Sequence, residues 1–246
     1  MEKRNLTRKG ALNLTCIGLF AAAGIIAVIT LAMSTQIAEG GWAEFLHALD
    51  RTQELIQSLD NRWLLALAIT AIFVLKTFIP IPFPFIFMMT GVMFRSGEAI
   101  LINSLGYCVV LVITYWVGNS TDGGVALKSL KKYDNIQEMI SHHGKTKLGV
   151  LAALRIVPGI PVNTVSKIYG GMGFPIHKYV AASLIGFFPK IWTYTVMGGN
   201  ISQPFTWSFM GPIIFLLILS GVVTLIVNIT LEKRKGEQEN VKNSNF

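Results

Sequence analysis

A stretch in the second half of the chain decides the fold, because it is apolar enough for a membrane but cannot form one continuous helix. Residues 148–174 read LGVLAALRIVPGIPVNTVSKIYGGMGF, with Arg155, Pro158 and Pro161 inside the apolar run. Proline removes a backbone donor and breaks a helix, and in lipid every freed polar group needs a partner. We therefore expect a helix, a break and a second helix, buried in protein or lining a wet cavity.

A second broken stretch lies earlier in the chain. Residues 63–94 read WLLALAITAIFVLKTFIPIPFPFIFMMTGVMF, in which Lys76 precedes Pro80, Pro82 and Pro84. Paired breaks at matching places in two halves of a membrane protein are typical of a transport site.

The composition indicates a membrane protein. Hydrophobic residues make up 52% of the chain and charged residues 14%, and the mean hydropathy is +0.55. The net charge of +8 does not indicate nucleic-acid binding, because Lys and Arg gather at the ends of apolar segments. Cys16 and Cys108 lie in separate apolar runs, which argues against a disulfide or a metal site.

Continuous spans of about 20 apolar residues are expected at residues 11–33, 99–118, 179–199 and 209–231. The first of them is interpreted as an uncleaved signal anchor. The connector at residues 39–62 has apolar residues at helical spacing, which predicts an amphipathic helix at the membrane surface or against the helix bundle.

Loop charge predicts how the two broken stretches lie. The N-terminus, the loop at residues 119–147 and the tail are basic and are therefore expected to be cytoplasmic, whereas the acidic connector is expected outside. Six full crossings would place the basic loop outside, but two re-entrant segments leave every loop on its preferred side. The first segment then enters from outside and the second from inside.

The predicted fold is an all-α integral membrane protein with about four transmembrane helices and two opposed re-entrant segments in an inverted repeat. Residues 1–62 would form the signal anchor and connector, and residues 63–199 the core. Residues 200–246 would form the last transmembrane helix and a cytoplasmic tail.

Basic side chains inside the broken stretches are the candidate ligand-binding residues, because an intramembrane charge costs about 2.5–3.5 kcal/mol on insertion. The guanidinium of Arg155 offers a planar fork of donors suited to phosphate or carboxylate. Its alternative role is to bind carbonyl groups that the helix break exposes. The other candidates, in the order in which we weigh them, are Lys76, Asn163 and Lys167.

Simpler roles are open for several of these residues. Asn163 is a common type of turn residue, and Lys167 could extend to the membrane surface. Gly170 and Gly171 would permit a tight return of the chain or a close helix contact.

The expected membrane interior contains several cations and almost no acids, which favours an anionic ligand. Glu98 is the carboxylate nearest to either broken stretch, and it lies at a segment boundary. The chain lacks a phosphate-binding glycine loop, an HExxH pair and a GxSxG elbow. We therefore expect no enzyme activity, no metal and no cofactor; membrane lipids are the expected partners, and a homo-oligomer is left open.

Two groups of motifs carry a family resemblance. The segment Arg155-Ile-Val-Pro158-Gly-Ile-Pro161-Val-Asn163, followed by Gly170-Gly171, resembles the SNARE-associated or VTT domain of the DedA superfamily. Its form is similar to the branch shared by yeast Golgi Tvp-type proteins and bacterial relatives. The looser upstream match is Pro80-Ile-Pro82-Phe-Pro84 with Tyr115-Trp-Val-Gly118, so that the resemblance covers about residues 76–199.

The resemblance implies two facing re-entrant helices and a role in handling lipids. Relatives move phospholipids or polyprenyl phosphate between leaflets, or are proposed proton-coupled transporters, and Arg155 matches the family's arginine in the second re-entrant segment. Acids expected for proton coupling are absent at Phe85 and Tyr107, and Asn119 stands where an arginine is often found.

These observations predict a plasma-membrane protein, with both termini cytoplasmic, that moves an anionic lipid between leaflets without proton coupling. The alternatives are a transporter for a small soluble anion and a membrane assembly or trafficking protein that transports nothing.

Overall fold

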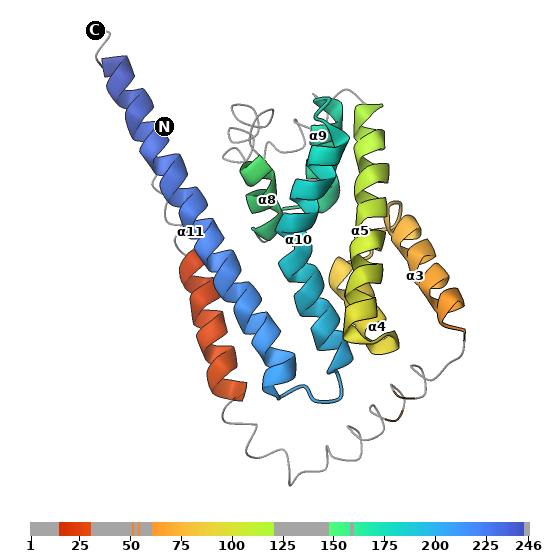
Figure 1. Ribbon diagram of the computed structural model, residues 1–246. Coiled ribbons are helices and arrows are strands. Elements are labelled where there is room, and N and C mark those ends of the chain that lie inside the picture. Colours follow the sequence, from red (N-terminus) through yellow and green to blue (C-terminus); the bar gives the residue numbers. More distant parts are fainter. Residues whose placement is uncertain are drawn as a thin grey trace.

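The computed structural model describes residues 15–30, 51, 54, 61–120, 148–157 and 160–243, and the regular structure in this part of the chain is helical (Figure 1). Three helices are long and apolar enough to cross a membrane: Ser96–Asn119, Ile176–Gly199 and Trp207–Thr230, with mean hydropathies of 2.0, 1.2 and 2.6. They confirm three of the predicted spans. The fourth is represented by the shorter apolar helix Thr15–Thr30, and its predicted ends lie outside the described residues.

Both broken stretches fold as predicted into two helices separated by a break. The first comprises α3 (Arg62–Lys76) and α4 (Phe83–Met93), and the second comprises α8 (Leu148–Ile156) and α9 (Val162–Gly171). In Figure 1, α3 and α4 occupy the lower half of the molecule and α8 and α9 the upper half. Re-entry of these pairs into a membrane from opposite sides stays a prediction.

A proline starts the second helix of each pair. Pro82 is the N-cap of α4 and Pro161 the N-cap of α9, with extended backbone angles of φ −64°, ψ 134° and φ −66°, ψ 122°. The fixed φ of proline suits the entry to a helix, where its missing N–H has no intrahelical partner to lose. Pro158 lies outside the described residues.

The two halves of the core repeat one order of elements. Each pair is followed by a long helix, α5 (Ser96–Asn119) in the first half and α10 (Ile176–Gly199) in the second. Lys76 and Arg155 occupy equivalent places, each six residues before the N-cap proline. The inverted repeat predicted from loop charge is therefore present in the order of the helices and in their placement at opposite ends of the molecule.

The short helix of each half packs on the long helix of the other half, with glycines at the contacts. The short helix α4 packs mainly on α10 of the other half, and α9 mainly on α5. A Cβ at Gly91 would collide with the Thr195 carbonyl oxygen, and one at the equivalent Gly170 would collide with the Tyr115 carbonyl oxygen. Two further glycines make the reciprocal contacts on the facing helices: Gly198 against Met88, and Gly118 against Lys167. Small residues thus allow the backbones to approach closely, as in other membrane helix pairs.

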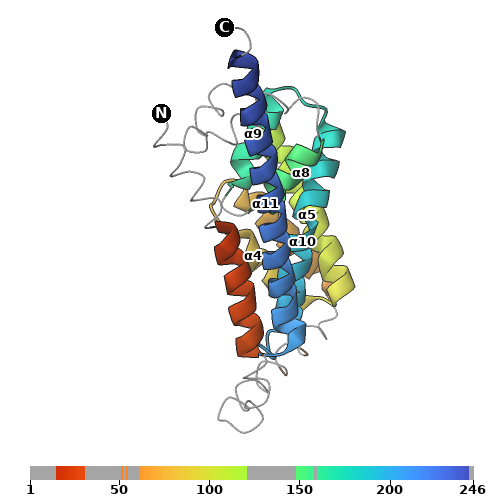
Figure 2. The ribbon, with the colours of Figure 1, turned by 90° about the vertical axis from the view of Figure 1, so that its left-hand side faces the viewer.

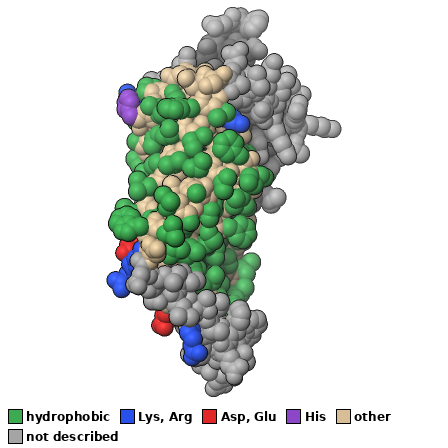
Figure 3. Space-filling view, turned by 90° about the vertical axis from the view of Figure 1, so that its right-hand side faces the viewer, with side chains coloured by type: hydrophobic (Ala, Val, Ile, Leu, Met, Phe, Trp, Pro, Cys, Tyr) green, Lys and Arg blue, Asp and Glu red, His purple; other side chains and the backbone are tan. Residues whose placement is uncertain are grey.

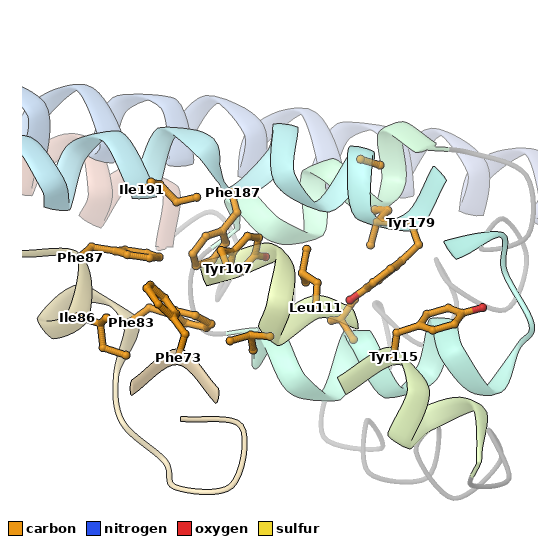
Figure 4. Packing of buried hydrophobic residues seen from close by; sticks show 14 of the residues in the cluster. Phe73, Phe83, Ile86, Phe87, Tyr107, Leu111, Tyr115, Tyr179, Phe187 and Ile191 are labelled. Carbon is orange, nitrogen blue, oxygen red and sulfur yellow. The ribbon is translucent and has the colours of Figure 1, made fainter. Parts of the chain in front are cut away.

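Aromatic side chains fill the centre between the halves (Figure 4). The rings of Tyr107 and Phe187 stack with centroids 4.5 Å apart and planes 9° apart. These two residues are equivalent in the repeat, since each lies eleven residues before the contact glycine of its helix. The pseudo-two-fold axis that relates the halves therefore passes between the two rings.

The C-terminal helix borders the core. This helix, α11 (Trp207–Asn243), packs on α10 and α8, and the helix Thr15–Thr30 lies along it, with the Phe20 ring against Gly221 (Figures 1 and 2).

The described surface is apolar over much of its height. On the face shown in Figure 3, hydrophobic side chains form a broad band and charged side chains lie near its ends. Leu101 and Leu105 of α5 are 65% and 68% exposed within this surface. Together with the three long apolar helices, this band identifies a membrane protein.

Candidate anion site at the two helix breaks

Arg155 lies in the last turn of α8 and is only 2% exposed. Its guanidinium donates four hydrogen bonds to neutral groups of α9 and α10. The acceptors are the Val162 carbonyl oxygen (2.9 Å from Nη1), Ser166 Oγ (3.2 Å from Nη2), Tyr179 OH (2.9 Å from Nη2) and Ser183 Oγ (3.3 Å from Nε). Arg155 thus ties three helices together at the second break, as the alternative role expected from the sequence requires.

The acceptors are themselves joined in a chain. Tyr179 OH donates to Ser166 Oγ at 2.6 Å, and Ser166 Oγ donates to the Val162 carbonyl oxygen at 2.8 Å. The guanidinium therefore sits on an ordered row of hydroxyl and carbonyl dipoles.

The positive charge of Arg155 has no acidic partner among the side chains that the structure describes. The ion pair seen in this part of the chain joins Arg62 and Glu98, 3.2 Å apart, with side chains 43% and 48% exposed. Glu98 lies in the first turn of α5, where a carboxylate favours the helix dipole. Glu98 therefore has the boundary position expected from the sequence. Because Glu98 pairs with Arg62, it does not compensate the buried positive charge of Arg155.

Lys190 supports the same break from α10. Its Nζ donates to the Arg155 carbonyl oxygen at 2.7 Å and lies 5.2 Å from the centre of the Phe187 ring. The Ile156 carbonyl oxygen accepts a bond from Ser220 Oγ of α11 at 3.4 Å. Side chains thus satisfy carbonyl groups that the end of α8 leaves without intrahelical donors.

Lys76, the equivalent of Arg155 in the first half, has different surroundings. It is 6% exposed and ends α3. Its Nζ lies 3.5 Å from the centre of the Phe83 ring, a cation–π contact. Among the described residues, no carboxylate or hydrogen-bond acceptor contacts this ammonium group.

The other predicted site residues are spread around the two breaks. Asn163 is half-buried in the first turn of α9, and its Oδ1 has no donor among the described residues. The Lys167 side chain is exposed, while its backbone contacts Gly118. Gly170 makes the crossing with α5, and Gly171 ends α9.

The prolines of the first break also take different places. Pro80 and Pro82 are exposed in the connection between α3 and α4, and Pro84 lies in the first turn of α4.

Several residues of the site were missed by sequence reasoning. Ser166, Tyr179 and Ser183 bind Arg155, and the hydroxyl groups of Tyr107 and Tyr169 are buried without a hydrogen-bond partner in the described part of the chain. The available signal was weak: Ser and Tyr recur at helical spacing after Arg155, but such residues are ordinary in membrane helices.

Comparison with protein families identifies the core. Residues 79–200 match the model of the VTT domain, so this region belongs to that family, in agreement with the resemblance to the SNARE-associated and DedA proteins. The match begins in the first break and ends just after α10. The proposed closeness to the Golgi Tvp-type branch stays a prediction. Comparisons with curated proteins and with solved structures gave no match.

Proposed function

We propose that this VTT-domain membrane protein moves an anionic lipid between the leaflets of the plasma membrane. The observation that carries the proposal is the pair of buried cations, Arg155 and Lys76, at equivalent places of the two halves and without a paired carboxylate in the described structure. A buried charge with no counter-ion is costly, and a negatively charged headgroup near it would lower that cost.

The arrangement of polar and apolar groups supports a lipid rather than a fully water-soluble ligand. The breaks place cations and unpaired polar atoms within the apolar core, while the outer surface of the helices is apolar. A lipid could keep its acyl chains at this outer surface while its headgroup passes the interior. The interior cations neutralise the head, and no bond is made or broken.

Loop charge supports an orientation with both termini cytoplasmic, so that the α3–α4 pair opens outward and the α8–α9 pair inward. The two breaks then meet near the middle of the bilayer, and a headgroup would have a positive charge within reach from either side. No acid among the described residues is placed to relay protons between them. The proposed movement is therefore uncoupled and follows the lipid gradient.

Leaflet exchange in reconstituted vesicles tests the proposal. Vesicles would contain a fluorescent phosphatidylglycerol or, in parallel, a fluorescent neutral diacylglycerol with the same chains, and a membrane-impermeant reductant would report the outward-facing fraction. We expect the protein to expose the inner pool of the anionic lipid and the Lys76→Met variant to lose this activity. Lys178→Met removes an exposed lysine of α10 and serves as the matched control.

Three outcomes would contradict the proposal. Exchange equal to that of protein-free vesicles would exclude lipid movement. Uptake of a soluble anion without lipid exchange would favour the soluble-anion transporter. Full exchange by a variant in which both Lys76 and Arg155 are replaced by Met would show that the buried charges play no part.

A further inference from the structure

We propose that Lys76 and the first turn of α4 form the contact site for a phosphate-type anion, and that Arg155 is a positioning residue for the second half. This assignment deepens the proposed function and rests on it. It also reverses the order expected from the sequence, in which Arg155 ranked above Lys76.

The repeat itself shows the difference between the two cations. The four groups that accept hydrogen bonds from Arg155 belong to residues of α9 and α10, and each has an equivalent in α4 or α5. In the order Val162, Ser166, Tyr179 and Ser183, the equivalents are Phe83, Phe87, Ala99 and Asn103. Val162 accepts through its backbone carbonyl oxygen, a group that Phe83 also has. Of the three side-chain acceptors, two have apolar equivalents, Phe87 and Ala99.

The remaining polar equivalent, Asn103, lies in α5. Its Nδ2 donates to the Phe87 carbonyl oxygen at 3.2 Å and to Thr195 Oγ1 at 2.8 Å, while its Oδ1 is buried without a donor among the described residues. The first half therefore has a buried cation at the position of Arg155 but lacks the row of hydroxyl groups that holds Arg155 in the second half.

The two cations therefore differ in how many N–H donors each could offer to a ligand. Four of the five guanidinium N–H groups of Arg155 are committed to neutral protein groups, so an anion could take them only by dismantling the junction of α8, α9 and α10. The Lys76 ammonium has three N–H donors and a described contact only with the Phe83 ring. A buried charged donor without an acceptor is unfavourable, and an anion would relieve that cost.

The start of α4 adds donors at the same place. Phe83, whose ring lies under Lys76 Nζ, is the first residue of α4. The N-cap is Pro82, which supplies no side-chain hydrogen bond, and α4 is 11 residues long. The first N–H groups of a helix have no intrahelical acceptor and favour an anion. In α4 these are the N–H groups of Phe83 and Phe85, because Pro82 and Pro84 have none. The buried ammonium of Lys76 thus lies against the residue whose N–H opens the helix.

The connection between α3 and α4 lies at the surface. In it, Phe78 is 76% exposed and Ile79 is 51% exposed. In the proposed re-entrant topology, the non-helical backbone of this connection needs water or protein around it, because lipid cannot satisfy its polar groups.

The chemistry of the site fits a phosphate group. A compact ammonium with rotatable donors acts as a point charge and needs no planar, bidentate partner, whereas helix-start N–H groups suit the tetrahedral oxygens of phosphate. A lipid phosphodiester and free phosphate share this chemistry, and the experiment below separates them.

Anion binding can be measured as the rise in the unfolding temperature of the full chain in a neutral detergent. Four proteins would be compared: wild type, Lys76→Met, Lys76→Arg and Arg155→Met. The probes are a short-chain phosphatidylglycerol, its neutral diacylglycerol counterpart, and inorganic phosphate, each titrated separately. We expect wild type to be stabilised by the anionic lipid and not by the neutral one. Stabilisation by inorganic phosphate at least as strong as that by the lipid would overturn the lipid assignment.

Lys76→Met is expected to keep or raise the unfolding temperature without ligand while its apparent affinity falls at least about tenfold, the loss expected for one charged hydrogen bond. Lys76→Arg should restore most of the affinity, because it keeps the charge. Arg155→Met should lower the unfolding temperature without ligand, and the affinity of its folded fraction should fall by less than that of Lys76→Met. This separation of stability from affinity is not expected if Lys76 is only structural.

Two results would overturn the inference: unchanged affinity of Lys76→Met, or loss of affinity in Arg155→Met without loss of stability. Failure of wild type to bind any anion would overturn it as well. Binding that depends on Lys76 without any leaflet exchange would leave the site standing and refute the proposed function.

Discussion

Replacing Arg155 by Met removes the junction between α8, α9 and α10 while keeping an unbranched apolar side chain in the space. Two of its four hydrogen bonds are short, at 2.9 Å to the Val162 carbonyl oxygen and 2.9 Å to Tyr179 OH. At about 1.5–3 kcal/mol for each bond to a charged group, these two contribute about 3–6 kcal/mol. Removing a buried charge offsets about 2.5–3.5 kcal/mol of this.

The net loss of stability is therefore about 0.5–2.5 kcal/mol. It stays moderate because Tyr179 OH and Ser166 Oγ still bond to each other and to the Val162 carbonyl oxygen, so that few groups are left without partners. At about 2–4 °C per kcal/mol for a chain of this size, the unfolding temperature should fall by roughly 1–10 °C.

Tryptophan fluorescence during heating in detergent would measure this shift, with Lys178→Met as the control that removes an exposed lysine from the start of α10. The control should unfold within about 1 °C of wild type, since exposed substitutions usually change stability by less than 0.5 kcal/mol. If Arg155→Met unfolds at the same temperature as this control, the junction does not stabilise the fold and the reasoning is wrong.

Five further substitutions, arranged in three tests, probe other contacts by the same measurement. Gly170→Ala forces a methyl group onto the α5 backbone and should cost about 1–3 kcal/mol, whereas Gly97→Ala, with open space around it, should cost nothing; equal effects would refute the glycine crossings. Tyr107→Phe removes a buried hydroxyl without a described partner and should leave stability unchanged or higher, but Tyr179→Phe should lower it by about 1–3 kcal/mol, and the opposite order would contradict the network around Arg155. Lys190→Met takes the donor from the end of α8 and should cost about 1–2 kcal/mol, so a neutral result would mean that this contact is not formed.

Local chemistry allowed the breaks and long helices to be predicted from the sequence. Prolines within apolar runs predicted where helices end, and Pro82 and Pro161 indeed start α4 and α9. Uniform apolar composition predicted four long spans, of which three are confirmed and the first is represented by the shorter helix Thr15–Thr30. The last helix, α11, continues to Asn243, past the predicted end of its span at residue 231. Charge next to those spans predicted that the two broken pairs enter the membrane from opposite sides, which stays a prediction. In Figure 1 the two pairs lie in opposite halves of the molecule.

The contacts within the site depend on tertiary structure and could not be predicted in the same way. Arg155 and Lys76 look alike as cations in broken apolar runs, but their environments are set by residues of other helices: Tyr179 and Ser183 for Arg155, and Phe83 for Lys76. Lys190 of α10 donates to the Arg155 carbonyl oxygen at the end of another helix. No periodicity within one helix predicts which carbonyl groups a break elsewhere will expose.

The proposed topology requires each broken pair to enter and leave the membrane on one side. Single cysteines at both ends of a pair, at residues 64 and 95 or at residues 149 and 173, would be placed in a chain from which Cys16 and Cys108 have been removed. A membrane-impermeant thiol reagent would then be applied to intact cells and to inverted membranes. We expect residues 64 and 95 to react from outside and residues 149 and 173 to react from inside. Labelling of the two ends of one pair from opposite faces would contradict the re-entrant topology.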